Sequence, residues 1–217
     1  ARVLYVDDGS RDRTWEVLTG IAASDPRVSL LRLSRNFGKE LALTAGLDQV
    51  DSDAAVVLDA DGQDPPELLP QFVERWRAGA DVVYGRRSSR RDDTWLKRST
   101  ARAFYKVIHR LSDTDIPSDA GDFRLISRRV LEALRSLRER QRFMKGLFAW
   151  VGYPTAAVDY ERPARIAGSS KWNYWRLWNF ALEGITGFST APLRAATYMG
   201  LASAALAFGY GAWIVFK

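Results

Sequence analysis

The sequence contains no cysteine and only one histidine, His109. The absence of cysteine excludes disulfide bonds, thiolate zinc sites and a cysteine nucleophile. A single histidine argues against a histidine-based metal cluster and against a Ser-His-Asp triad. Acidic side chains are also in deficit, because 26 Asp and Glu residues face 32 Lys and Arg residues, for a net charge of +6. This surplus indicates an anionic partner, which is nucleic acid, a phospholipid surface or a phosphate-bearing substrate.

Charged residues are missing from 195–216. A helix of about 22 residues, at about 1.5 Å per residue, is about 33 Å long, enough to cross the hydrocarbon core of a bilayer. The alternative is an Ala-rich core helix of a soluble protein. Small residues at Gly200 and Ala204, and at Ala205 and Gly209, are spaced to let a neighbouring membrane helix approach, so a homo-oligomer is possible.

Basic residues precede this apolar segment, namely Arg162, Arg165, Lys171, Arg176 and Arg194. By the positive-inside tendency they predict a globular part that faces the cytoplasm at the plasma (inner) membrane. The first expected strand, 2–6, begins without a leader or cap, and the chain stops directly after the apolar segment. We therefore expect both ends to be cut from a longer protein with at least one more span.

The stretch 56–67 carries the strongest chemical signal. A short apolar run ends in Asp59 and Asp61, one residue apart, and a turn then leads into Pro-Pro-Glu at the start of a helix. Two carboxylates at the carboxyl end of a buried strand suit a hard divalent cation such as Mg2+ or Mn2+, and Gln63 has a carbonyl oxygen to complete or orient the ligand set. The alternative is a strand-end turn that is rich in Asp because Asp suits turns.

Strand and helix patterns alternate along the chain. Strands are expected over 2–6, 28–33, 53–59, 81–84 and 155–160. Helices follow the first four strands and end near 23, 50, 78 and 111, and a further helix is expected over 127–137. This alternation predicts an α/β fold with a doubly wound, mostly parallel, Rossmann-like sheet.

Further polar residues are expected at the same sheet edge. Asp7 and Asp8 follow the first strand and suit a nucleotide base or ribose, although a helix-capping turn would look similar. Lys39 lies in the turn after the second strand. Arg86 follows the fourth strand and suits a diphosphate, with a solvated loop as the equal alternative.

Two later segments are also candidates. In 118–125, carboxylates and an arginine flank Gly121, which lets the backbone approach a ligand closely. The basic loop 161–172 suits closure over phosphate. The helix expected over 95–111 has one apolar and one basic face, which fits an anionic membrane surface as well as it fits packing on a core. The aromatic cluster 172–178 suits a membrane interface.

Four motifs occur in order: Val6-Asp7-Asp8-Gly9-Ser10, Asp59-Ala60-Asp61-Gly62-Gln63-Asp64-Pro65-Pro66-Glu67, Gly121-Asp122-Phe123-Arg124 and Gly168-Ser169-Ser170-Lys171-Trp172. Together they resemble glycosyltransferase family 2, within it the membrane-associated polyprenyl-phosphate and dolichyl-phosphate sugar synthases. The resemblance covers nearly the whole chain. It implies a GT-A fold, a nucleotide-sugar donor, a divalent metal and a lipid-phosphate acceptor. The family's first strand and its nucleotide loop are absent from this sequence, which leaves the donor site without one wall.

The resemblance also implies roles for individual residues. The metal ligands would be Asp59, Asp61 and Gln63; the donor site would use Asp7, Asp8, Lys39, Asp59, Arg86, Arg162 and Lys171; the acceptor side would use Arg124 and Ser170; and the catalytic residues would be Asp61, Asp122 and Asp119. The implied organisation is a catalytic domain over 1–165, a basic loop and juxtamembrane aromatic helix over 166–192, and a transmembrane helix over 193–217.

The predicted reaction is inverting transfer of a sugar, with UDP-glucose and undecaprenyl phosphate as the favoured substrates and GDP-mannose as the alternative donor. A phosphate monoester is largely a dianion at neutral pH, so the enzyme must mainly supply positive charge. Two other classes remain as remote alternatives. The Asp-x-Asp-Gly motif also resembles haloacid-dehalogenase-type phosphatases, but Gln63 follows the glycine where Thr or Val is usual. A nucleic-acid-binding module is suggested by charge alone, but the aromatic residues gather beside the apolar segment, so no nucleic acid is expected.

Overall fold

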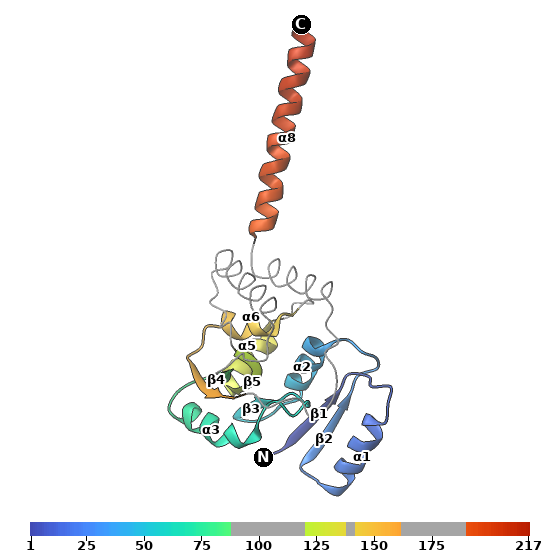
Figure 1. Cartoon of the computed structure of the whole chain (residues 1–217), viewed down its shortest axis with the longest axis vertical. Coiled ribbons are helices and arrows are strands. Elements are labelled where there is room, and N and C mark those ends of the chain that lie inside the picture. The colour runs from blue at the N-terminus through green and yellow to red at the C-terminus, as the bar shows by residue number, and fades with distance from the viewer. Residues whose placement is uncertain (88–119, 138–141, 162–189) are drawn as a thin grey trace. The chain divides into compact units, whose positions relative to one another are not determined.

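The computed structural model describes residues 1–87, 120–137, 142–161 and 190–217. The chain divides into two compact units, Ala1–Arg91 with Asp119–Ser169, and Asp92–Ser118 with Ser170–Lys217. Figure 1 traces the elements of each unit in chain order. The expected helix over 95–111, the basic loop after Glu161 and the aromatic cluster 172–178 lie outside the described residues.

The first sheet has two parallel strands, β1 (Val3–Asp7) and β2 (Val28–Arg32), in a register that pairs Asp7 with Arg32. Helix α1 (Thr14–Ser24) connects them and lies against β2 (Figure 1). Helix α2 (Lys39–Asp48) follows β2 and packs on β1. Gly46 makes this packing close, because a Cβ there would lie 2.9 Å from the Val6 side chain. The turn after β1 also meets the start of α2, because Asp8 accepts hydrogen bonds from the N–H groups of Phe37 and Gly38.

The second sheet has four strands in the order β3-β5-β4-β6. They are β3 (Ala54–Val57), β4 (Val82–Arg87), β5 (Ala120–Ser127) and β6 (Thr155–Tyr160). Strands β3, β4 and β6 run in one direction, and β5 is antiparallel to both of its neighbours, β3 and β4. The sequence predicts every one of these strands except β5. This missed strand carries Asp122 and Arg124 into the middle of the sheet.

One face of the second sheet is covered by the short helix η1 (Pro66–Leu68) and by α3 (Leu69–Arg77). Phe72 of α3 is fully buried, and its ring centroid lies 4.5 Å from that of Phe123. Tyr160 meets Phe123 edge-on at 5.8 Å. Fully burying one such apolar side chain contributes about 1.5–3 kcal/mol, so this aromatic group ties β5 to α3 on one face of the sheet and to β6.

Helices α5 (Arg128–Ser136) and α6 (Met144–Trp150) complete the first unit. The Ser127 hydroxyl accepts a hydrogen bond from the Val130 N–H at 3.4 Å and caps α5. The Arg135 guanidinium donates to the carbonyl oxygens of Leu47, Asp48 and Val50. Because these carbonyls end α2, the arginine both caps α2 and ties α5 to it.

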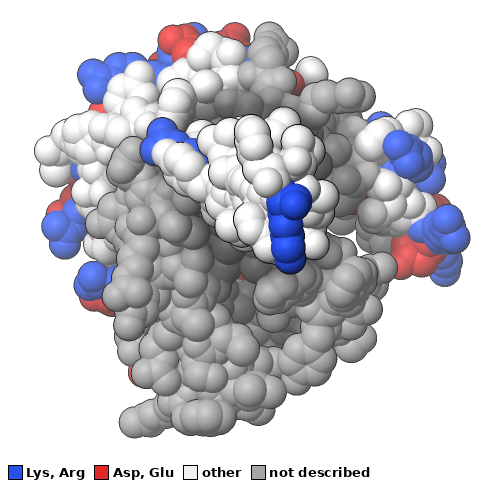
Figure 2. Space-filling model, turned by 90° about the horizontal axis from the view of Figure 1, so that it is seen from above, with Lys and Arg blue, Asp and Glu red and all other residues white. Residues whose placement is uncertain are grey.

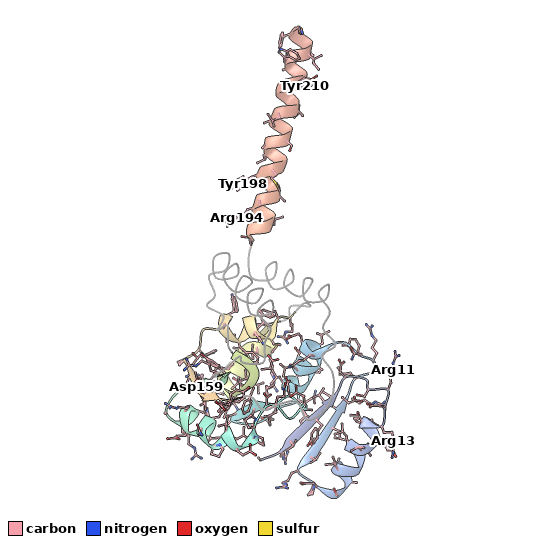
Figure 3. The ribbon with its side chains drawn as sticks, in the orientation of Figure 1. Arg11, Arg13, Asp159, Arg194, Tyr198 and Tyr210 are labelled. Atoms are coloured by element: carbon pink, nitrogen blue, oxygen red, sulfur yellow. The ribbon has the colours of Figure 1, made fainter. Side chains whose placement is uncertain are left out.

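In the second unit the structure describes α8 (Ala191–Phe216). Its segment Leu193–Phe216 has a mean hydropathy of 1.6, is long enough to cross a membrane and has 0 % of its apolar window buried. The surface of this helix is almost free of charged side chains (Figure 2), with Arg194 and Tyr198 near its start and Tyr210 nearer its end (Figure 3). The predicted apolar helix is confirmed.

Candidate active site

A three-residue ion network lies at the carboxyl end of β3. The ammonium of Lys39, the first residue of α2, lies 2.7 Å from both carboxylate oxygens of Asp59. The same nitrogen lies 2.6 Å from Oδ2 of Asp122 on β5. Side chains that the sequence assigns to the donor, the metal and catalysis thus meet on one cation, which we call the Lys39 bridge.

The charges of the Lys39 bridge support one another. Burial alone would lower the pKa of Lys39, but Asp122 and Asp59 outweigh it and raise the pKa above its ordinary value. Burial alone would raise the pKa of Asp122, but Lys145 and Lys39 outweigh it and the pKa is lowered. Lys39 is therefore a cation and Asp122 an anion at neutral pH.

The loop after β3 is folded around its own acids. Asp64 accepts a hydrogen bond from the Asp59 N–H at 2.9 Å, and Asp61 accepts one from the Gln63 N–H at 3.1 Å. Gly62 has a φ of +73°, which permits the turn between them. Gln63 and Asp64 are each 8 % exposed. Hydrogen bonds within the loop therefore define its shape around Asp59 and Asp61, which have one residue between them.

Asp59 and Asp61 suit a divalent cation whose remaining ligands come from the substrate and from water. Among the residues that the structure describes, no three His, Cys, Asp or Glu side chains gather into a metal cluster. Mg2+ is commonly held by one or two carboxylates, with substrate phosphates and water as its other ligands. A two-carboxylate oxygen donor set suits that mode, in which the substrate completes the site.

Asp7 and Asp8 support the loops around them. Asp7 is 3 % exposed, accepts a hydrogen bond from the Ser10 N–H at 3.0 Å, and lies 3.3 Å from the guanidinium of Arg32. Asp8 accepts hydrogen bonds from the N–H groups of Phe37 and Gly38 at 2.7 and 2.9 Å. These bonds join the turn after β1 to the turn before α2, and the nucleotide contacts predicted for the two acids remain a prediction.

A cavity of about 600 Å³ lies between these same two turns. It is lined by Gly9, Ser10, Arg11, Arg32, Leu33, Ser34, Arg35 and Asn36. Arg11 and Arg13 lie on the outer side of the domain, in the segment between β1 and α1 (Figure 3). The guanidinium of Arg35 covers the ring of Phe37 at 4.5 Å. Three arginines, Arg11, Arg32 and Arg35, therefore line the cavity.

Arg86 and Arg124 have different surroundings from those expected of ligand-binding residues. Arg86 makes two hydrogen bonds to Asp159, of 2.6 and 2.9 Å, and both side chains are about half exposed. Arg124 is 4 % exposed, donates to the Gly121 carbonyl at 2.6 Å and lies 3.9 Å from the Phe148 ring. Burial lowers the pKa of Arg124 to about 10, against the opposing effect of Asp122. Arg124 thus supports β5 from within the domain.

The sequence missed Glu40. Its carboxylate accepts a hydrogen bond from the Met144 N–H at 3.0 Å, which joins α2 to the start of α6. Burial raises the pKa of Glu40 above its ordinary value. The only sign of Glu40 in the sequence is its position directly after Lys39. An acid in the first turn of a helix is common, because it interacts favourably with the helix dipole, so this position did not mark Glu40 as a site residue. The predicted site residues Asp119, Arg162, Ser170 and Lys171 lie outside the described residues.

Comparison with known proteins decides the family. The sequence model described as "Glycosyl transferase family 2" matches residues 1–135. The chain belongs to glycosyltransferase family 2. It is therefore a glycosyltransferase, as the four motifs predict, rather than a haloacid-dehalogenase-type phosphatase or a nucleic-acid-binding module.

Several curated members of family 2 are similar over nearly the whole chain. An uncharacterized glycosyltransferase of Synechocystis, sll0501, is 48% identical over 215 residues, which is 99% of this chain and 68% of that protein. A bactoprenol glucosyl transferase of Shigella phage SfX is 51% identical over 213 residues, 98% of this chain and 70% of that protein. A prophage bactoprenol glucosyl transferase homolog of Escherichia coli K12 is also 51% identical, with the same coverage of 98% and 70%.

A solved structure supports the fold. The mannosyltransferase PcManGT from Pyrobaculum calidifontis, in complex with GDP-Man and Mn2+, aligns with 97% of this chain and 70% of its own, at a TM-score of 0.50 and 19% identity. At that identity the likeness concerns the fold alone. The expected α/β fold of the GT-A type is confirmed.

Proposed function

We propose that this family 2 glycosyltransferase moves glucose from UDP-glucose to a polyprenyl phosphate, such as undecaprenyl phosphate, with inversion at the anomeric carbon. The observation that carries the proposal is the 51% identity, over 98% of the chain, to proteins named bactoprenol glucosyl transferase. Bactoprenol is a polyprenol, so the acceptor class follows from those names. GDP-mannose remains the alternative donor.

The charge arrangement suits this reaction. Its two substrates are a nucleoside diphosphate sugar and a lipid phosphate, both anions, and the phosphate is already nucleophilic at neutral pH because its second pKa is about 6. The protein must hold the anions together and stabilise the diphosphate as it leaves. The arginines around the cavity, Arg11, Arg32 and Arg35, supply positive charge of this kind.

A divalent cation, Mg2+ or Mn2+, would be held by Asp59 and Asp61, with phosphate oxygens of the donor as further ligands. It would supply charge stabilisation for the leaving diphosphate. Gln63 is mostly buried, and its backbone N–H donates a hydrogen bond to the Asp61 carboxylate. We therefore assign Gln63 the role of positioning Asp61. We assign to Asp122, which is anionic and paired with Lys39, the orientation of the acceptor; the ion pair with Lys39 supports this role.

The proposed place of action is the cytoplasmic face of the inner membrane. A helix that can cross a bilayer supports membrane attachment. A lipid acceptor requires the catalytic unit to reach the headgroup region of that bilayer. The basic residues that precede the helix support the cytoplasmic side.

The test is a transfer assay with the full chain in detergent or liposomes, undecaprenyl phosphate and radiolabelled UDP-glucose or GDP-mannose, with Mn2+. Extraction of the label into the lipid phase reports transfer. We expect label from UDP-glucose, at a rate at least about tenfold above that from GDP-mannose. Label from GDP-mannose alone would assign the alternative donor, and label from neither would contradict the proposed function.

A further inference from the structure

The Lys39 ammonium is surrounded by carboxylate oxygens, as a bound metal cation would be. It contacts both oxygens of Asp59 at 2.7 Å and one oxygen of Asp122 at 2.6 Å. The Asp122 side chain is only 13% exposed and that of Asp59 is 29% exposed, so water screens these contacts less than it screens a surface pair. One of the two carboxylates predicted to bind the metal, Asp59, is thus already neutralised by the protein's own cation.

A divalent cation on Asp59 must compete with this ammonium. Two cations on one carboxylate repel each other strongly at such distances, so Lys39 has to leave Asp59 when the metal binds. The geometry allows it, because Lys39 keeps its second carboxylate, Asp122, on the neighbouring strand β5. Lys39 also starts α2 directly after Gly38, and its side chain is about half exposed, which leaves it room to shift.

We propose that Lys39 is an internal counter-cation that keeps divalent metal off Asp59 until an anionic nucleotide arrives. The inference rests on the proposed function and deepens it, since it names the residue that couples metal to donor. A nucleoside diphosphate brings the negative charge that offsets the repulsion between metal and ammonium. Metal and nucleotide then bind cooperatively, and by linkage each raises the affinity of the other by the same factor.

The experiment measures free Mn2+ by electron paramagnetic resonance in titrations of the full chain, with and without UDP. The variant Lys39→Met keeps the length of the side chain and removes its charge. Lys39→Arg keeps the charge. Arg13→Gln removes one positive charge from an exposed pair with Glu16, at the outer side of the domain (Figure 3), and controls for net charge.

We expect Lys39→Met to bind Mn2+ alone about tenfold more tightly than the wild type and to gain less affinity from UDP, within the usual range of such couplings. Lys39→Arg and Arg13→Gln should behave as the wild type does. Unchanged Mn2+ affinity in Lys39→Met, or an equal gain in Arg13→Gln, would overturn the proposal.

A wild-type measurement keeps the proposal testable if Lys39→Met does not fold. The wild type must bind Mn2+ much more weakly alone than with UDP, and equal affinities would overturn the role of Lys39. The proposed function and the proposed role of Lys39 can fail separately. The transfer of glucose by the wild type tests the function, and it does not depend on how tightly the protein binds Mn2+ without nucleotide.

Discussion

Glu40 accepts a hydrogen bond from the backbone N–H of Met144 at 3.0 Å, across more than a hundred residues of sequence. The contact holds the first turn of α2, which carries Lys39, against the first turn of α6, which carries Lys145. Both lysines lower the pKa of Asp122. The Glu40 contact therefore fixes the distance between the two helices whose lysines act on Asp122.

Glu40 makes the stability of the catalytic unit depend on pH. Its pKa is raised by burial above the ordinary value of 4.5, so the folded state binds its proton more tightly than the unfolded state does. Stability is therefore lost as the pH rises from 4.5 through the folded pKa. Glu40→Gln keeps a hydrogen-bond acceptor and removes the charge, so its melting temperature should fall less than that of the wild type between pH 4 and pH 7.

The control for this series is Glu16→Gln. Glu16 is exposed, and its pKa is lowered by the hydrogen bond from Arg13, so its effect on the pH dependence has the opposite sign. Melting curves followed by tryptophan fluorescence measure all three proteins. Parallel pH profiles of the wild type and Glu40→Gln would show that the raised pKa is wrong.

Asp61→Asn should lower transfer by roughly 100-fold or more, the usual cost of losing one group that stabilises developing charge. The melting temperature should change little, because the side chain lies in a loop at the end of β3. Asp53→Asn is the matched control, since Asp53 is an exposed acid at the opposite end of the same strand. Equal rates for Asp61→Asn and Asp53→Asn would remove Asp61 from the site.

Gly9→Ala should destabilise the turn that holds Asp8. Gly9 has a φ of +67°, and a Cβ there would lie 2.5 Å from the backbone carbon of Arg35. Strain of this kind costs about 1–3 kcal/mol, which lowers the melting temperature by several degrees. Gly20→Ala, in α1 with nothing within 4 Å of its Cβ, should instead stabilise by about 0.5–1 kcal/mol. Equal melting temperatures for the two variants would contradict the described turn.

Deletion of 191–217, which removes α8, should release the protein from membranes. An apolar helix that spans the bilayer resists high salt, whereas basic residues alone hold a protein only electrostatically. In liposome flotation with high salt, the full chain should float and the shortened chain should remain at the bottom. Equal flotation of both would contradict the assignment of α8 as the membrane anchor.

The elements that sequence predicts well are those with simple periodicity. The apolar runs of β1, β2, β3 and β6 alternate with helices, as the sequence predicts. The sequence places the polar ends of the strands at one edge of a single sheet, whereas the structure divides the strands between two sheets, β1-β2 and β3-β5-β4-β6. Strand β5 is not recognised in the sequence, because the glycine and the charged residues at 121–124 are typical of a turn. Those charges are tolerated in a strand only because distant residues compensate them, Lys39 for Asp122 and the Phe148 ring for Arg124. Such long-range pairing has no local signature.

The same reason limits the prediction of the site. Sequence places Lys39 and Asp59 at a common edge, but their contact with each other and with Asp122 depends on the antiparallel insertion of β5 beside β3. Likewise, the Asp-Asp motif after β1 predicts a ligand site, while the structure engages both oxygens of Asp8 with the backbone of 37–38. A motif indicates the chemistry that is present, and the fold decides which side chains support it.

The central claim is that a divalent cation at Asp59 and Asp61 brings two anionic substrates into reaction. The most direct measurement is the transfer of glucose from UDP-glucose to undecaprenyl phosphate by chelator-treated wild-type protein, titrated with Mn2+ or Mg2+. The account predicts background transfer without metal and full recovery when metal is restored, with no recovery in Asp61→Asn. Undiminished transfer by the metal-free protein would contradict it.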